Sequence, residues 1–503
     1  MAATGPLPKK FNAPLLSELG AQQDKKHEKR SRIEEVRKKL GRQPSGGGQQ
    51  LALSAQSASP DIQTSVPERA LARAEAVLQA KGSAAGSTAQ RDLAGMAAIK
   101  IFVKEEGWYR VTQPELAAGG LNAGVNPKTL QLFVDGMEQP ILVAAANPNQ
   151  FGPQDAIEFY ATGLDTRWTD TRAYWLIAGN SYGKRIGTST GKGTQGALSF
   201  PFTVEKKDRE IYVAAAHNGD AENFFGALIA PNAPPAEELV ELLHLDTSRA
   251  ATLAVTIQGL TSGAHAVDVL FNGTSVGQMS FNGQTSASAS FAIPQSELID
   301  GDNYVSLESM AGDMDYSGLD SIRVTYWHTF TADNDSLKLT AQNGKKISKV
   351  SVSGFTNPNI RVVDVTYPAA TTEVKGTVST NGSDYSVTFT APGAGNRTLL
   401  AFTREKIKTA AGVAANQPSS WSKSGAHYDM VMISHGSFLA NLALLRGLRE
   451  SQGLSVALVD VEDLYDEFSY GAKSAQAIRD FLSLTYAQGN APRFVAAFCC
   501  RPR

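Results

Sequence analysis

The chain has 503 residues, with 47 Lys and Arg against 49 Asp and Glu, which gives a net charge of −2. This balance excludes a polybasic protein that coats nucleic acid or an anionic membrane, and no apolar run approaches the ~20 residues that cross a bilayer. The 45 Gly residues favour turn-rich β structure, and the 2 Cys, adjacent at positions 499 and 500, exclude a disulfide scaffold. At roughly 100–200 residues per domain, the length predicts three or four domains.

The first region, residues 1–95, is predicted to be disordered or linker-like, with short helices. Within it, residues 22–40 place Glu28 four positions before Arg32, a spacing that favours a helix. The apolar stripe of this segment is narrow. We therefore expect a helix that is solvated on all sides.

Linker composition and a missing targeting signal mark the rest of this region. Residues 44–60 and 81–90 are rich in Gly, Ser, Gln and Ala, and they flank an Ala-rich helix predicted over residues 68–79. Residues 1–20 lack the charged, apolar and small-residue parts of a signal peptide. The N-terminus therefore predicts no secretion signal in this chain.

Three β regions are predicted to follow, at residues 96–205, 206–332 and 333–416. The first opens on alternating apolar residues from position 99 and contains Asp135-Gly136, a typical hairpin turn. It is expected to form a small β-rich domain, and the third region a small β domain of its own.

The middle β region has the clearest period of two. Leu253, Val255 and Ile257 alternate with polar residues, and Asn272-Gly273 marks a tight turn. Short strands at such spacing predict a β-sandwich.

Residues 417–503 change from a strand pattern to an alternation of strands and helices. Apolar strands are predicted at residues 430–433, 456–459 and 494–498, and Ser437 is expected to cap the helix after the first of them. The resulting β-α-β-α-β order is typical of a doubly wound parallel sheet. The predicted fold class is therefore multidomain and mainly β, followed by an α/β domain.

The α/β region resembles the gingipain-type cysteine peptidase family. The segments that carry the resemblance are residues 428–435 (YDMVMISH), 448–454 (LRESQGL), 459–471 (VDVEDLYDEFSYG) and 477–482 (AIRDFL), with looser similarity at 104–111 (KEEGWYRV) and 416–421 (NQPSSW). The resemblance implies a β-rich pro-region before a caspase-like α/β domain, a secreted or cell-surface parent protein, and proteolysis of a protein or peptide substrate. A Cys thiolate and a His base would carry the reaction.

In the family, the His and the Cys follow hydrophobic strands downstream of the acidic segment. Here the sequence after residue 495 departs from the family pattern, so we expect a truncated peptidase domain that ends before the catalytic dyad and is inactive alone. His435 and Cys499 each follow an apolar strand and are weaker candidates for the dyad. With a single strand between them, they need not be neighbours.

Calcium is the cofactor that the acidic residues suggest. Asp460, Glu462 and Asp463 follow a predicted strand in a dense carboxylate loop, and hard cations prefer oxygen ligands. The spacing does not match an EF-hand loop, so N-capping of a helix together with solvated charge is the favoured alternative. The resemblance also implies calcium in some family members. Further candidates in the β regions are Asp313, Asp315, Asp320, Asp333 and Asp335. No cofactor is required by the predicted chemistry.

A non-enzymatic function is the alternative. The sandwich would then serve adhesion or carbohydrate binding, and the α/β tail would be vestigial. Trp168, Trp175 and Trp327 are the candidates for a flat sugar-binding platform, although core packing is the more common fate of such residues. The sequence predicts neither the cleavage specificity nor the oligomeric state.

Overall fold

The computed structural model describes residues 13–42, 84–191, 194–196, 198–219, 221–343, 348–393 and 395–498. These residues form two compact units. Unit 1 combines the N-terminal helix with residues 198–331, and unit 2 contains the flanking segments before and after them. The predicted linker at residues 44–60 and the predicted helix at residues 68–79 lie outside the described residues. No described helix is both long and apolar enough to span a bilayer.

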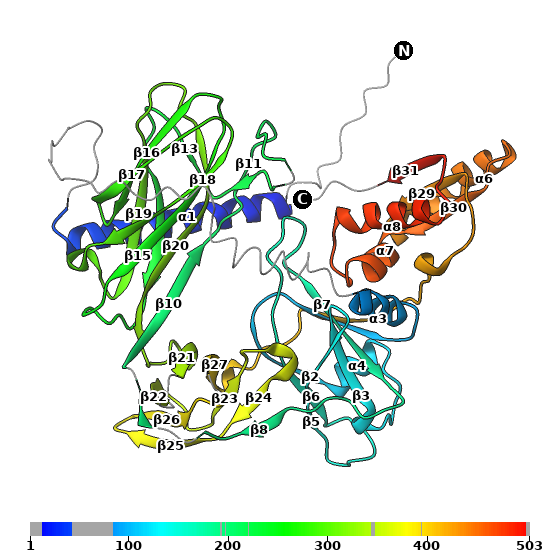
Figure 1. The fold of residues 1–503 in the computed structure, drawn as a ribbon, viewed down its shortest axis with the longest axis horizontal. Helices are drawn as coiled ribbons and strands as arrows, with labels where there is room; N and C mark the ends of the chain where they lie inside the picture. Colours follow the sequence, from blue (N-terminus) through cyan, green and yellow to red (C-terminus); the bar gives the residue numbers. More distant parts are fainter. Residues whose placement is uncertain are drawn as a thin grey trace. The chain divides into compact units, whose positions relative to one another are not determined.

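Unit 1 is a β-sandwich (Figure 1), as its alternating sequence predicts. One sheet has the order β10-β20-β15-β18, with β13 also on β20, and the other has the order β14-β19-β16-β17. The strands are β10 (Ser199–Lys206), β13 (Ala227–Ile229), β14 (Ala236–Leu242), β15 (Ala251–Gly259), β16 (Ala264–Phe271), β17 (Thr274–Asn282), β18 (Ser286–Ile293), β19 (Gly301–Ser309) and β20 (Ser317–Thr329), beside a short hairpin of β11 (Ile211–Tyr212) and β12 (Phe224–Phe225).

The sandwich core confirms the predicted alternation. Leu253, Val255 and Ile257 are fully buried between the two sheets, and each such side chain contributes about 1.5–3 kcal/mol. Asn272 and Gly273 both have positive φ, as the tight turn requires. The predicted start at residue 206 is wrong, because β10 begins at residue 199 and pairs with β20 along its whole length.

The helix of unit 1, α1 (Ala13–Lys39), is longer than predicted and is not solvated on all sides. Ile33 and Val36 are buried against Tyr304 of the sandwich. The positive φ of Gly41 ends the helix as a left-handed cap. The narrow apolar stripe is therefore a packing surface, which corrects the expectation of a helix solvated on all sides.

Unit 2 begins with a helix where the sequence predicted a linker. Leu93 and Ala94 of α3 (Ala84–Ala94) pack on Trp175, which explains why this Ala- and Ser-rich segment is ordered. Two sheets follow, in the orders β28-β1-β7-β3-β4 and β2-β6-β5. Their elements are β1 (Ile99–Val103), β2 (Gly107–Thr112), α4 (Gln113–Ala118), β3 (Leu130–Val134), β4 (Met137–Gln139), β5 (Leu142–Ala144), β6 (Ala156–Ala161), β7 (Arg172–Ala178) and β28 (Gly412–Ala415).

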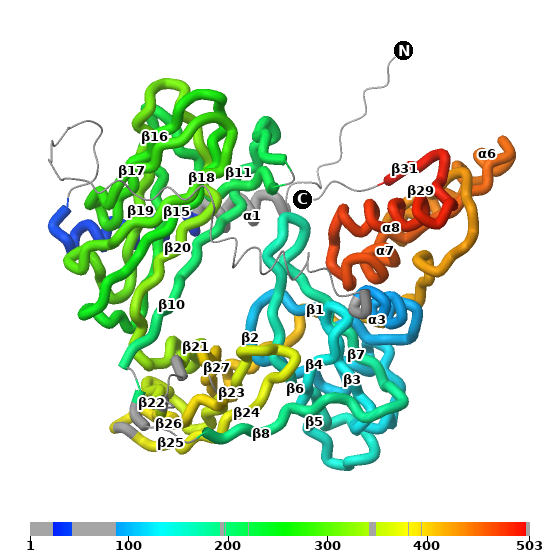
Figure 2. The backbone as a smooth tube through the Cα atoms, viewed as in Figure 1, coloured from blue at the N-terminus to red at the C-terminus, as the bar shows by residue number. Residues whose placement is uncertain are grey.

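A second β module of unit 2 is built from segments that precede and follow the sandwich in the sequence. Its sheets have the orders β21-β27-β23-β24-β8 and β25-β26-β22-β9. The strands are β8 (Gly187–Ser189), β9 (Thr194–Gln195), β21 (Ser336–Asn343), β22 (Ser348–Phe355), β23 (Ile360–Asp364), β24 (Thr372–Val374), β25 (Gly376–Asn381), β26 (Asp384–Thr390) and β27 (Gly395–Thr403). Since β8 pairs with β24 (Figure 2) and β9 with β22, the predicted module 333–416 also includes residues 187–195.

The last part of unit 2 is the predicted parallel α/β sheet, in the order β30-β29-β31. Its elements are β29 (Met430–Ser434), α5 (Gly436–Leu439), α6 (Ala443–Ser451), β30 (Val456–Asp460), α7 (Val461–Phe468), α8 (Ala475–Ala487) and β31 (Phe494–Phe498). Two details differ from the prediction. The acidic segment forms helix α7 because Val461 and Leu464 pack on the sheet, and His435, rather than Ser437, caps α5.

Candidate functional site

The candidate site lies at the carboxyl edge of the parallel sheet, where the ends of the three strands meet. Ser434 is in register with Asp460 of β30 on one side and with Phe498 of β31 on the other. Its hydroxyl donates to the carbonyl of Phe498 at 2.9 Å. This edge is where ligands bind in open α/β sheets.

His435 follows β29 directly and is exposed at this edge. Its Nδ1 accepts the backbone N–H of Ser437 at 3.2 Å and lies 2.8 Å from the hydroxyl of Ser437. A ring nitrogen that accepts an amide hydrogen carries no proton, so the neutral ring carries its proton on Nε2. In this arrangement the imidazole caps a short helix, and its other nitrogen is a donor rather than a base.

Asp460 ties the loop after β29 to the start of α7. One of its carboxylate oxygens accepts the backbone N–H groups of Gly436 at 3.1 Å and of Glu462 at 3.0 Å. A Cβ at position 436 would lie 2.3 Å from the other oxygen, so only glycine permits this approach. The predicted calcium ligand therefore acts as a helix cap and a loop anchor.

Cys499 and Cys500 lie outside the described residues, but the strand before them is described. β31 pairs directly with β29, since β29 is the central strand. β30, the strand between them in the sequence, lies on the other side of β29 and does not separate β29 from β31 in the sheet. The topology brings the ends of the two strands that carry them to adjacent positions.

The remaining acidic residues of α7 hold the α/β part against the rest of unit 2. Asp463 accepts from the indole N–H of Trp421 at 3.0 Å. Glu467 accepts three hydrogen bonds of 2.7–2.8 Å, from the hydroxyl of Ser419 and the backbone N–H groups of Trp421 and Ser422. These contacts clamp the segment that leads into β29.

Asp466 forms a buried ion pair with Lys100 of β1 at 2.8 Å. The side-chain amide of Gln90 in α3 donates to the Asp466 carbonyl at 2.9 Å, and the indole of Trp175 donates to the Tyr470 carbonyl at 3.1 Å. Burial raises the pKa of Asp466 to about 7, although Lys100 pulls it down. The seam between α7 and the first β sheets thus contains a carboxyl group that titrates near neutrality.

Close backbone packing at this seam also requires glycine. Gly471 has a φ of +86°, and a Cβ there would lie 2.9 Å from the Cβ of Ala173. The acidic residues were evident from the sequence, but their neighbours Lys100, Gln90 and Trp175 were not. The acidic density itself was the signal, since buried carboxylates need cations or donors.

The predicted calcium ligands are not brought together. Asp460 binds backbone amides and Asp463 binds Trp421, and the residues that the structure describes contain no group of three or more His, Cys, Asp or Glu placed to hold a metal ion. The β-region candidates have separate partners as well. Asn232 donates to Asp313, Lys207 faces Asp320, and Asp335 accepts from Thr356. The backbone of Asp333 forms an isolated β-bridge with Ser336.

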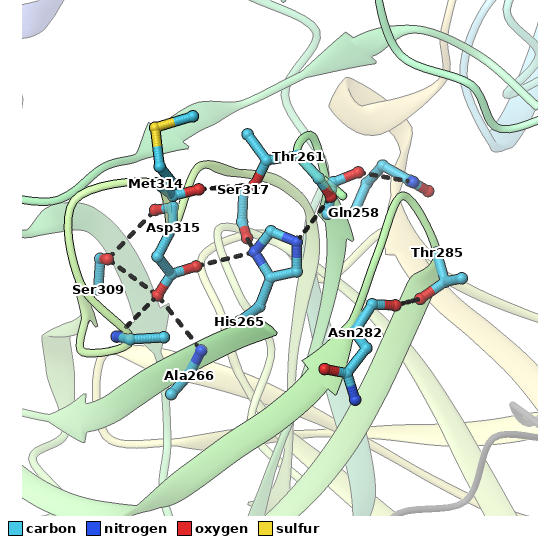
Figure 3. A network of polar contacts seen from close by, with 12 residues as sticks. Gln258, Thr261, His265, Ala266, Asn282, Thr285, Ser309, Met314, Asp315 and Ser317 are labelled. Atoms are coloured by element: carbon cyan, nitrogen blue, oxygen red, sulfur yellow. Dashed lines mark hydrogen bonds and ion pairs between the residues drawn. The ribbon is translucent and has the colours of Figure 1, made fainter. Parts of the chain in front are cut away.

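Asp315, the fifth β-region candidate, belongs to a buried network in the sandwich (Figure 3). Its carboxylate lies 2.8 Å from His265 Nδ1 and also accepts from the hydroxyl of Ser309 and the backbone N–H groups of Ala266 and Ala311. His265 Nε2 lies 3.1 Å from the carbonyl of Thr261. Four protein groups thus contact this carboxylate.

The three tryptophans do not form a platform. Trp175 is fully buried. Trp168 is half-exposed, with Arg167 4.5 Å over its ring, and Trp327 has Arg249 4.6 Å over its ring. The prediction of a sugar-binding platform is therefore wrong for Trp175, because this side chain is packed in the core.

Comparisons with known proteins give one family and one fold. Residues 423–498 match the model of peptidase family C25. No curated protein sequence matches the chain. Among solved structures, dimeric latent PorU from Porphyromonas gingivalis is 17% identical with a TM-score of 0.58, and the match covers 80% of this chain. The chain spans only 41% of the length of that structure.

Two carbohydrate-binding modules also match part of the chain. One is a family 36 module in complex with calcium and xylotriose, at 17% identity and a TM-score of 0.19, which covers 24% of this chain and 98% of the module. The other is a family 36 module of a xylanase from the hindgut metagenome of Trinervitermes trinervoides, at 11% identity and a TM-score of 0.18, covering 25% and 95%. Such low scores carry no argument about function.

Proposed function

Residues 423–498 belong to peptidase family C25, and on this premise we propose that the chain is part of a gingipain-like cysteine endopeptidase. The observation that carries the proposal is the family match, which falls on a three-stranded parallel sheet. In that sheet the ends of β30 and β31 lie on either side of the end of β29 at the carboxyl edge. The similarity of the fold to that of latent PorU supports it. The substrate would be a protein or peptide, and the parent protein would be secreted or displayed at the cell surface.

The chemistry of such an enzyme is covalent. A cysteine thiolate attacks the scissile carbonyl, an imidazole moves the proton to the leaving amine, and backbone N–H groups stabilise the oxyanion. We propose that this chain alone leaves peptides uncleaved. In support, His435 uses Nδ1 to accept an amide hydrogen and so presents a donor rather than a base.

The direct test is hydrolysis of a peptide library by the full chain, compared with His435→Ala, Cys499→Ala and the matched control Cys500→Ala. We expect no cleavage above a blank for any of the four. Cleavage that is lost in His435→Ala and Cys499→Ala but kept in Cys500→Ala would overturn this expectation and assign the dyad to His435 and Cys499. Rates of thiol alkylation at pH 7 give a second readout, because a thiolate paired with an imidazole reacts faster.

Calcium binding at the acidic segment stays a prediction. Calorimetric titration with Ca²⁺ would test it, with Asp460→Asn as the variant and Asp480→Asn as the control in the neighbouring helix. Binding heat that is lost in Asp460→Asn but kept in Asp480→Asn would support a calcium site for which Asp460 gives up its hydrogen bonds to the backbone. Absence of binding heat in the parent chain would exclude this site.

The adhesion or carbohydrate-binding alternative is less favoured. Trp175 is buried in unit 2, so the three tryptophans do not offer a common sugar-binding face. A glycan array probed with the full chain tests this alternative directly. Reproducible binding together with an absence of hydrolysis would move it to first place.

A further inference from the structure

The outer face of β14 and β19 in unit 1 is acidic around an apolar centre. Glu237, Leu239 and Glu241 project from β14, and Asp302 and Tyr304 project from the neighbouring strand β19. Tyr304 and Leu239 pack in a cluster that is separate from the core of the sandwich. This face therefore presents carboxylates on either side of a small hydrophobic patch.

Helix α1 matches this face in shape and charge. Its Ile33 and Val36 are buried on Tyr304, with Leu40 beside them. Cationic side chains flank that stripe and reach the carboxylates, whereas Arg30 and Lys38 are exposed on the other side of the helix. A basic amphipathic helix is the ligand that such a face fits.

The charge pairs between helix and face are numerous and short. Arg32 binds both oxygens of Asp302, at 2.9 and 2.5 Å, and Lys29 binds Glu238 at 2.7 Å. The Arg37 guanidinium pairs with Glu237 and lies 5.2 Å over the ring of Tyr304.

One further pair closes the end of the helix. Arg42 donates to Glu297 at 2.6 Å and to the hydroxyl of Thr274 at 2.8 Å. Bidentate and partly buried pairs of this kind add geometric specificity to the attraction between charges. The docked orientation of α1 is therefore fixed by contacts along residues 29–42.

The sandwich does not need α1 for its own core. The two buried side chains of α1 belong to the separate cluster around Tyr304, and the sheets close on each other without them. The helix has its own support from the Glu28 and Arg32 spacing. Removing it would expose carboxylates and one tyrosine rather than the interior.

We propose that this face is a docking site for a basic amphipathic helix, that α1 occupies it reversibly, and that a vacated face accepts the α1 of a second copy of this chain. The exchanged helix would make the same ion pairs in the second molecule. Because the pairs are partly exposed, added salt weakens the docking, since the screening length falls from about 10 Å at 0.1 M to about 3 Å at 1 M.

Two full-length variants test the exchange. Arg32→Glu with Arg37→Glu disables the helix and leaves the face intact, and Glu237→Lys with Asp302→Lys disables the face and leaves the helix intact. Each variant alone should be monomeric by light scattering at low salt. Mixed in equal amounts, they should form a 1:1 complex, which dissociates at high salt.

The matched control carries Arg30→Glu with Lys38→Glu, which makes the same charge change on the exposed side of α1. This variant keeps its own helix docked and should form no complex with the face-disabled chain. Unchanged circular dichroism of each variant confirms that the sandwich is folded. A mixture that stays monomeric while both variants are folded, or a control that associates equally well, would overturn the proposal.

Discussion

Asp315 in the sandwich and Asp466 in α7 are both buried carboxylates, with His265 beside the first and Lys100 beside the second, yet their pKa values move in opposite directions. Burial acts to raise the pKa of Asp315, but hydrogen bonds from His265, from the amides of Ala311 and Ala266 and from Ser309 hold it below its usual range. Burial raises the pKa of Asp466 to about 7, with Lys100 as the main opposing group. The number of donors, more than the presence of a cation, separates the two.

The surroundings explain this difference. Asp315 lies in a loop whose Ala311 amide turns back toward the carboxylate, and Ala266 of β16, His265 and Ser309 supply the remaining contacts. Asp466 lies within a helix whose own amides are already bonded, so only side chains from other elements can reach it. A carboxylate in a loop can collect amide donors that a carboxylate within a helix cannot.

The largest effect is expected for Asp315→Asn. It removes the charge opposite His265 and turns an amide N–H toward other donors, so it should destabilise the sandwich by about 3 kcal/mol. Hydrogen exchange of β16 and of the loop at residues 310–316 measures the loss locally. Asp313→Asn, on the exposed part of the same loop, is the control and should change stability by less than about 0.5 kcal/mol.

Glu467→Gln is expected to cost less, about 1–3 kcal/mol, because it replaces an acceptor of three hydrogen bonds by a group that can accept only part of them. Like Asp315, Glu467 accepts several hydrogen bonds, but it lies in the same helix as Asp466. It therefore separates the effect of donor number on stability from the effect of a position within a helix. Exchange at residues 419–422 is the measurement. Equal protection in Glu467→Gln and in the control Glu462→Gln would contradict the role of donor number.

Asp466→Asn should change the pH dependence of unit 2. A carboxyl group whose pKa is raised on folding stabilises the protein fully below its unfolded value near 4, and that contribution is lost as the pH rises through about 7. Urea midpoints followed by Trp fluorescence should therefore fall between pH 4 and 7 in the parent chain and fall less in the variant. The opposite sign holds for Asp315, whose contribution is lost only as the pH drops below about 4.

The smallest effect is expected for His435→Ala. The side chain is exposed and caps a helix of only four residues, so its loss should cost about 0.5–1 kcal/mol at most. His265→Ala should cost several times more, because it removes a fully buried ring and leaves the buried carboxylate of Asp315 without one of its hydrogen-bond partners. Similar urea midpoints for the two alanine variants would show that burial does not distinguish these histidines.

Much of the α/β fold was predictable from local pattern. The apolar runs at residues 430–433 and 494–498 gave strands within one residue of those observed. Helix N-capping was the favoured alternative to calcium binding for the acidic segment, and Asp460 does cap α7. The extent of α7 was not predicted, although Val461, Leu464 and Phe468 have helical spacing. The short strands β8 and β9 were missed because two or three residues carry no period.

The candidate site was only partly predictable, for a different physical reason. The cap by Asp460 joins residues 24 positions apart, within one β-α unit, and the sequence pointed to that residue. The pair of Lys100 with Asp466 joins residues 366 positions apart. Nothing in either local sequence names the other partner, because contacts of this kind follow from how modules pack rather than from local spacing.

The interleaved connectivity of unit 2 has a consequence for the order in which the chain folds. The side-chain amide of Asn416 donates to the carbonyl of Ala94, 322 residues earlier, and β28 completes the sheet begun by β1. At about 5–20 residues per second of synthesis, β1 leaves the ribosome roughly 15–60 s before β28, its partner strand, is made. During that interval the edge of β1 that later pairs with β28 is unpaired. A chaperone that covers this edge until β28 is synthesised would protect the nascent chain from aggregation.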